Sequence, residues 1–190
     1  MTRSVEATSA DAGSRARLLD RLRRLAMVSG KEMRLASGRS STIYFDMKMA
    51  MFDPETMSLI ADAILEVARA RGAAQVGGLE MGAVPIIGAV ACRSFPNHPL
   101  RGFFVRKTVK AHGTQKRIEG CFEPDAPTLL LEDVTTTGGS VLDALAAVRE
   151  AGGDADAVLT VVDREEGARD ALAAAGVELI ALYTKSDFRA

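Results

Sequence analysis

The sequence has few cysteines, almost no net charge and no long apolar run, and each shortage excludes a class of protein. The two cysteines, Cys92 and Cys121, lack the spacing of a metal site, so we interpret them as reduced thiols in a cytoplasmic protein. A formal net charge of -1 creates no overall field that would attract nucleic acid or an acidic membrane. No apolar stretch approaches the roughly 18 residues of a membrane span. We therefore expect no nucleic-acid partner and no membrane partner.

The length and composition predict one globular domain. A chain of 190 residues can bury a sizeable core, and 47% hydrophobic with 26% charged residues is typical of a soluble protein. Residues 1–15 contain no apolar signal core and are expected to form a disordered tail. We expect a single domain over residues 16–190, with an N-terminal hood at 16–52 and a core at 53–190.

Strand and helix patterns alternate from residue 53 onward, which predicts an α/β fold. Asp53, Pro54 and Gly72 suit the cap, the first turn and the end of a helix. Strands are then expected at 100–107, 128–133, 156–164 and 177–184, and helices at 140–153 and 165–176. This order favours a mainly parallel sheet covered by helices on both faces, with the ligand at the carboxyl ends of the strands.

The N-terminal segment carries two different patterns. Residues 14–30 place leucines on one face of a basic amphipathic helix, which we interpret as a docking helix with a solvated face. In residues 41–53, Met47, Met49 and Met51 alternate with other residues. That period predicts a strand whose methionines fill the core.

The stretch LLLEDVTTTGGS, residues 129–140, combines a buried strand with acids, hydroxyls and glycines. Glu132 and Asp133 fall at the carboxyl end of the strand, where they can bind sugar hydroxyls or a hydrated magnesium ion. Gly138 and Gly139 lead into a helix whose first backbone N–H groups can bind a phosphate. A plain capped helix would explain one hydroxyl and one glycine. It would not explain two adjacent acids after a buried strand, where a charge without a partner is costly.

Two common phosphate-binding motifs are missing. The chain contains no GxxxxGK followed by Ser or Thr, and no GxGxxG. It therefore has neither a P-loop nor the dinucleotide fingerprint. A monophosphate on a ribose fits the LLLEDVTTTGGS stretch better than either.

Four stretches together resemble the orotate phosphoribosyltransferases, a branch of the type I phosphoribosyltransferases. Residues 129–140 resemble the family's phosphoribosyl-pyrophosphate motif, and FFVRKTVKAHGTQKRIEG at 103–120 resembles its mobile catalytic loop. LASGRSSTIYFDMK at 35–48 resembles the N-terminal substrate segment, and VVDREEG at 161–167 resembles the orotate-contacting segment. The resemblance implies a type I phosphoribosyltransferase fold, with a central mainly parallel sheet flanked by helices and a small N-terminal hood.

The resemblance also implies a glycosyltransferase reaction of pyrimidine (UMP) biosynthesis. The family transfers the 5-phosphoribosyl group from phosphoribosyl pyrophosphate (PRPP) to orotate, giving orotidine 5′-monophosphate and pyrophosphate. Its Mg2+ is held mainly by PRPP and not directly by side chains. The catalytic residues carried over are Lys110, His112 and Asp133, and orotate would contact Thr136 and Arg164. The residues expected to bind PRPP are Arg106, Lys107, Lys110, His112, Glu132, Asp133, Val134, Thr135, Thr136, Thr137, Gly138, Gly139 and Ser140.

The resemblance implies a homodimer, and the chain also departs from the family pattern. In the family, a lysine and a histidine of the loop reach the neighbouring subunit's site, which by resemblance would be Lys110 and His112. Residues 77–85 match the pyrophosphate-binding loop, where many members have a lysine; this chain has none there and has the acidic Glu80. Ala36 stands where many members have a lysine before SGR. Both departures reduce the positive charge around the ligand.

Two points stay open at the level of sequence. Tyr44 and Phe45 match the family's aromatic pair near orotate, but such a pair fits a core equally well. His112 could donate a proton to pyrophosphate or act as a hydrogen-bonding cation. Taken alone, the basic loop would be a solvated loop or a small RNA-binding patch, but beside the phosphate motif the catalytic interpretation is favoured.

Two other functions are weighed against orotate transfer. A purine phosphoribosyltransferase would keep the fold, but the arginine of DREEG and the RK-xx-K-x-H loop argue against it. A non-catalytic regulator that senses PRPP would need a nucleic-acid module, and one helix before residue 35 is too little for a winged helix-turn-helix. The length also leads us to expect no fused decarboxylase.

Overall fold

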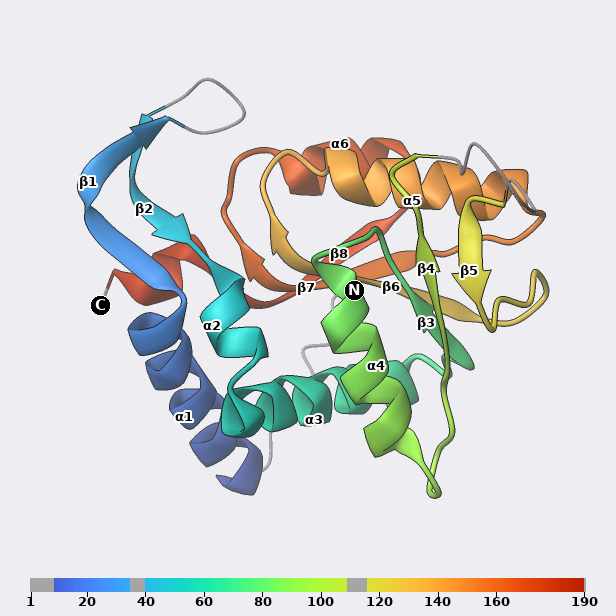
Figure 1. Cartoon of the computed structure of the whole chain (residues 1–190), viewed down its shortest axis with the longest axis horizontal. Coiled ribbons are helices and arrows are strands. Elements are labelled where there is room, and N and C mark those ends of the chain that lie inside the picture. The colour runs from blue at the N-terminus through green and yellow to red at the C-terminus, as the bar shows by residue number, and fades with distance from the viewer. Residues whose placement is uncertain (1–8, 35–39, 109–115, 190) are drawn as a thin grey trace.

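The computed structural model describes residues 9–34, 40–108 and 116–189, with a six-stranded sheet at its centre (Figure 1). The strands are β3 (Gln75–Gly77), β4 (Arg101–Val105), β5 (Ile118–Gly120), β6 (Thr128–Thr135), β7 (Ala157–Asp163) and β8 (Glu178–Thr184). Their order across the sheet is β5-β4-β3-β6-β7-β8. Every neighbouring pair is parallel except β4 and β5. The predicted α/β fold with a mainly parallel sheet is confirmed.

Helices cover both faces of the sheet. They are α3 (Pro54–Ala70), α4 (Ala83–Ser94), α5 (Gly139–Glu150) and α6 (Ala168–Ala174). Helices α3 and α4 lie on one face, and α5 and α6 lie on the other (Figure 1). Side chains of β6 alternate between the two cores: Leu129 and Leu131 pack on the side of α3, and Leu130 packs on the side of α5. This explains why the strand reads as a continuous apolar run.

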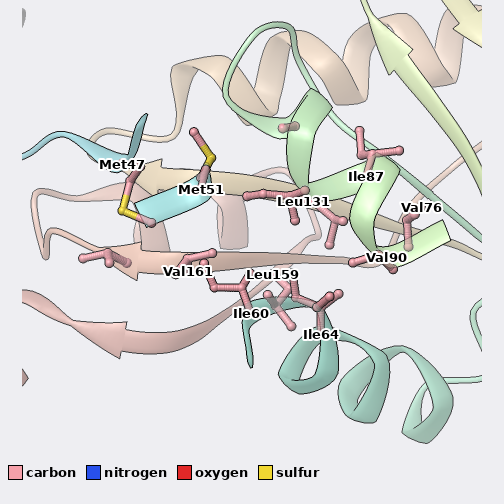
Figure 2. Packing of buried hydrophobic residues seen from close by; sticks show 14 of the residues in the cluster. Met47, Met51, Ile60, Ile64, Val76, Ile87, Val90, Leu131, Leu159 and Val161 are labelled. Atoms are coloured by element: carbon pink, nitrogen blue, oxygen red, sulfur yellow. The ribbon is translucent and has the colours of Figure 1, made fainter. Parts of the chain in front are cut away.

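The larger core is built from branched aliphatic side chains. Figure 2 shows Ile60 and Ile64 of α3 directed towards Leu159 and Val161 of β7. Ile60, Ile64, Leu159 and Val161 are each fully buried. Burying one such side chain contributes about 1.5–3 kcal/mol relative to leaving it exposed. The core therefore holds β6 and β7 firmly, and these two strands carry most of the candidate site.

Helix α3 begins as the sequence predicts. The Asp53 carboxylate accepts a hydrogen bond from the Thr56 backbone N–H at 2.8 Å, and Pro54 occupies the first turn. Asp53 also pairs with Arg21 of α1 (Ser9–Leu25) at 2.6 Å. This pair joins the N-terminal helix to α3. Helix α1 begins at Ser9, inside the segment 1–15 that was expected to be a disordered tail.

A second, antiparallel sheet follows α1. It consists of β1 (Met27–Arg34) and β2 (Ser40–Phe45), and a short helix, α2 (Met47–Met51), comes next. The strand β1 lies partly where the amphipathic helix was expected. The division into a hood at 16–52 and a core at 53–190 stays a prediction.

The methionines at 47–51 were predicted to lie on a strand, and this prediction is wrong: they lie on helix α2. The Asp46 side chain accepts a hydrogen bond from the Lys48 backbone N–H and so caps the helix. Met47, Ala50 and Met51 are buried at helical spacing, whereas Met49 is 65% exposed. The alternation of methionines with other residues therefore did not indicate the secondary structure, whose buried side chains follow helical spacing.

Two further features were not expected from the sequence. Strand β5 lies in a segment that we expected to be a loop, and it pairs antiparallel with the edge of β4. A short 3-10 helix, η1 (Lys185–Phe188), ends the described chain and packs Phe188 against Phe45 with ring centroids 4.8 Å apart. None of the described helices is long and apolar enough to cross a membrane.

Candidate active site

Two adjacent acids lie near the end of β6, between β3 and β7. Glu132 is only 6% exposed, whereas Asp133 is half-buried. Burial raises the pKa of Glu132 well above its ordinary value, the charge of Asp133 raises it further, and the positive charge of Lys107 opposes the rise. Two carboxyl groups in such a position are stabilised by hydroxyl donors or by cations. The pair is therefore suited to bind a ligand.

Strand β6 continues to Thr135, beyond the end expected at residue 133. Val134 pairs with Val162, and Thr135 pairs with Asp163 of β7. The acids thus project from the strand itself and not from a loop. The extended backbone fixes their direction.

The turn between β6 and α5 leaves the first amides of α5 open to a ligand. Gly138 is the N-cap residue and has a φ of 86°, a left-handed conformation that favours glycine. No described side chain caps this helix end. Thr137, Gly139 and Ser140 are exposed, so N–H and hydroxyl donors are available where the helix dipole favours an anion.

The threonines of this turn are not equivalent. Thr136 is half-buried, and Thr135 is buried with a hydroxyl that has no hydrogen-bond partner among the described residues. The Thr135 carbonyl accepts a hydrogen bond from the Arg164 backbone N–H at 2.9 Å. Thr135 therefore joins the ends of β6 and β7 through its backbone.

The loop between β3 and α4 lies directly against the acids. A Cβ atom placed on Gly82 would lie 2.5 Å from Asp133 Oδ1 and 3.1 Å from Glu132 Oε1. The peptide bond between Glu80 and Met81 is cis. The close approach of Gly82 to Asp133 and Glu132 puts the loop that resembles the pyrophosphate-binding loop beside the acids expected to hold ribose.

Glu80 connects this loop to the start of the cationic loop. Its Oε1 accepts a hydrogen bond from the Lys107 backbone N–H at 2.9 Å. Its own N–H donates to the Val105 carbonyl at 2.8 Å, and the Val105 N–H donates to the Gly78 carbonyl at 2.8 Å. Glu80, the acid that departs from the family pattern, therefore makes its side-chain hydrogen bond to the backbone of the cationic loop.

Arg106 and Lys107 follow β4 and begin the predicted catalytic loop. The positive charge of Lys107 partly offsets the rise in the pKa of Glu132. The Arg106 backbone N–H donates to the Arg117 carbonyl at 2.8 Å, which ties the two ends of the loop together. The other predicted loop residues, Lys110 and His112, lie outside the described residues.

Arg164, the predicted orotate contact, follows the end of β7. It is 3% exposed, and its Nη2 lies 3.0 Å from Glu166 Oε1. The side chain of Glu166 is 10% exposed, and its other carboxylate oxygen has no hydrogen-bond partner among the described residues. The buried pair fixes the Arg164 guanidinium beside the ends of β6 and β7.

The two predicted aromatic residues take different positions. Phe45 is buried and packs against Phe188, so it belongs to the core. Tyr44 is 37% exposed. Only Tyr44 is therefore placed where a ligand can reach it.

Lys48, an exposed residue of α2, was not among the residues expected at the site. Its ammonium lies 2.8 Å from Asp46 Oδ1. The hydrogen bond and charge of Asp46 raise the pKa of Lys48, and the charges of Tyr44 and Asp133 add to the rise. Lys48 thus adds positive charge on the side of Asp133. The expected strand concealed it, because a helix exposes Lys48 and buries Met47 and Met51.

The strand order, the paired acids and the glycine turn into α5 can be compared with known proteins. The orotate phosphoribosyltransferase of Rhodopseudomonas palustris is 48% identical over 180 residues, which cover 92% of this chain and 96% of that protein. A crystal structure of the Mycobacterium tuberculosis orotate phosphoribosyltransferase matches with a TM-score of 0.80 and 37% identity, covering 92% of this chain and 98% of that one. A structure of that enzyme in complex with PRPP matches with a TM-score of 0.77 and 33% identity, covering 93% and 99%. No protein-family model matches the sequence.

The fold is that of a type I phosphoribosyltransferase, as the predicted fold class stated. Within that class, identity of 48% across nearly the full length of a relative is decisive. The chain belongs to the orotate phosphoribosyltransferase family. The predicted family is confirmed.

Proposed function

We propose that this chain transfers the 5-phosphoribosyl group from PRPP to orotate, giving orotidine 5′-monophosphate and pyrophosphate in pyrimidine biosynthesis. One observation carries the proposal. Paired acids and an uncapped helix end lie on one strand and its turn, with Gly82 of a second loop in contact with the acids. A ribose 5-phosphate with a diphosphate on C1 presents hydroxyls and anions in a matching arrangement.

The ribose and its 5′-phosphate would bind along β6 and the turn that follows it. Glu132 and Asp133 would accept hydrogen bonds from the ribose 2′- and 3′-hydroxyls, which would also offset the cost of burying Glu132. The phosphate would lie at residues 134–140, on the amides that begin α5. This binding fixes the position of C1.

Pyrophosphate leaves as the bond between C1 and oxygen breaks, and the orotate ring nitrogen bonds to C1 and releases its proton to pyrophosphate or water. Negative charge then grows on the leaving group, while C1 becomes cation-like. Arg106 and Lys107, with Lys110 and His112 by resemblance, would stabilise that charge, and amides of the loop at 77–85 would add donors. Thr136 and Arg164 would hold orotate, with the guanidinium paired to its carboxylate.

Mg2+ would be held mainly by PRPP. The described residues contain no group of three or more His, Cys, Asp or Glu side chains that could hold a metal ion. The oxygens of the diphosphate would supply its ligands, together with water. The ion would neutralise the leaving group.

We also propose that the protein forms a homodimer and acts in the cytoplasm. The family resemblance supports subunits that each supply Lys110 and His112 to the neighbouring subunit's site. Lys110→Ala chains mixed with Asp133→Asn chains would then regain roughly a quarter of wild-type activity, because each mixed dimer has one intact site. Equal inactivity before and after mixing would contradict shared sites.

The decisive experiment follows orotate absorbance with purified protein, PRPP and Mg2+. Wild type should consume orotate, and Lys110→Ala should be about a hundredfold slower or worse. Turnover of a purine base without turnover of orotate would favour the purine enzyme. Tight PRPP binding with no turnover of any base would favour the regulator.

A further inference from the structure

We propose that Arg117 is a positioning residue that holds Arg106 and Lys107 in place relative to the phosphate-binding end of α5, through its ion pair with Asp143. The inference rests on the proposed role of Arg106 and Lys107 at the leaving pyrophosphate. Arg117 itself lies at the far end of the loop, and the family resemblance assigns it no role.

Arg117 contacts two structures at once. Its Nη2 donates to both carboxylate oxygens of Asp143, at 3.0 and 2.9 Å. Its Nε and Nη2 also lie 3.4 and 3.3 Å from the Arg106 carbonyl oxygen. The Arg106 N–H donates back to the Arg117 carbonyl at 2.8 Å. A planar guanidinium can satisfy such a set of acceptors, and an ammonium cannot.

Asp143 places this contact on the helix that would bind the phosphate. It lies in α5 three residues after Ser140, so both residues fall on the same side of the helix. The phosphate-binding turn is therefore connected to Arg106 through one turn of α5, the ion pair of Asp143 with Arg117 and the Arg106 carbonyl. Glu80 holds Lys107 through a separate contact, the hydrogen bond to its backbone N–H.

The ion pair is a weak stabiliser of the fold. The side chains of Arg117 and Asp143 are 25% and 45% exposed, and partly solvated pairs contribute little to stability. Catalysis is more sensitive to position than folding is, because a displacement of about 1 Å can slow a reaction by about a hundredfold. Loss of the pair should therefore affect the rate much more than the melting temperature.

The test is a double-mutant cycle with Arg117→Gln, Asp143→Asn and the double variant. Each single variant should lower kcat by about tenfold or more, and the double variant should be no worse than either one, because the residues act as a unit. The KM for orotate should stay unchanged, since Arg164 and Thr136 lie elsewhere, while the Kd of pyrophosphate should rise by about tenfold. Arg93→Gln is the matched control: it removes a comparable exposed bidentate pair, with Asp62, away from the loop, and should leave kcat unchanged.

Arg106→Ala and Lys107→Ala separate this inference from the proposed function. If both slow the reaction and the Arg117 and Asp143 variants do not, the inference is overturned and the proposed function stands. If neither slows it, Arg106 and Lys107 do not act on the leaving pyrophosphate, so there is nothing to position; the inference then fails while the transferase activity stands. A kcat loss that is additive in the double variant, or that comes with an equal loss of orotate affinity, would also overturn the inference. Asp143→Asn is nearly isosteric, so it keeps the test valid even if Arg117→Gln folds poorly.

Discussion

Gly82 lies in direct contact with Asp133: a Cβ on the glycine would come within 2.5 Å of the carboxylate oxygen. Gly82→Ala must therefore displace the acid or the loop. We expect a loss of about 1–3 kcal/mol in the free energy of unfolding. We also expect PRPP to bind about tenfold more weakly, because the acids shift. Calorimetry of PRPP binding and urea unfolding measure the two effects.

Gly88→Ala provides the control for that prediction. Gly88 lies in α4, the helix that Gly82 precedes, and apart from its chain neighbours and the nearby backbone of that helix no described atom lies within 4 Å of the position of its Cβ. Alanine there should raise stability by up to about 1 kcal/mol and leave PRPP binding unchanged. A similar loss of PRPP affinity in both variants would mean that Gly82 has no special contact.

Glu132→Gln should increase stability and decrease PRPP affinity. The raised pKa means that the folded chain holds this proton more firmly than the unfolded chain does. The stability of the wild type therefore falls as pH rises above about 4.3, the ordinary value, and continues to fall until the folded-state pKa is passed. Glutamine does not ionise and removes this loss, while PRPP should bind about tenfold to a hundredfold more weakly.

Urea unfolding of Glu132→Gln and wild type between about pH 5 and pH 8 measures the stability difference. The advantage of the variant should grow with pH. A difference in the free energy of unfolding that stays constant across this range would show that folding does not raise the pKa of Glu132.

Glu80→Ala should slow the reaction by about threefold to tenfold, because the Lys107 backbone N–H loses its acceptor. Glu80→Gln keeps an acceptor at the same place and should react at nearly the wild-type rate. The kcat of both variants decides the matter. If glutamine is as slow as alanine, the charge of Glu80 matters and the hydrogen bond does not.

Glu166→Gln should destabilise the chain by about 3 kcal/mol, because it leaves the buried Arg164 charge without its carboxylate. The KM for orotate should rise, while the KM for PRPP should change little. Glu165→Gln is the matched control: Glu165 is exposed, glutamine can still accept the hydrogen bonds from Ser186, and stability should change by less than about 1 kcal/mol. Equal effects of both substitutions would show that the buried pair does not orient Arg164.

The sequence predicted those parts of the fold that local patterns determine. The Asp53 cap, the apolar run before Glu132 and the glycine turn after it each follow from short stretches, and the structure has them where expected. Parallel pairing followed from the alternation of strands and helices. The division of the chain into a hood and a core stays a prediction.

What the sequence did not reveal depends on contacts between distant segments. Strand β5 exists because Phe103 and Val105 pair with residues that show no period of their own. The Gly82 contact and the ion pair of Arg117 with Asp143 need the folded chain to bring loops together. The methionine period misled because Asp46 caps a helix there, and burial, not alternation, decides which methionines face the core.

The hydrogen bond from the Tyr183 hydroxyl to the Arg15 carbonyl, at 2.6 Å, and the packing of Phe188 on Phe45 have a consequence for biosynthesis. A ribosome releases α1 and β2 long before their partners in β8 and η1. The early segments can therefore complete their packing only after Phe188 has left the exit tunnel. Until then, Phe45 lacks the aromatic ring that packs against it in the folded chain.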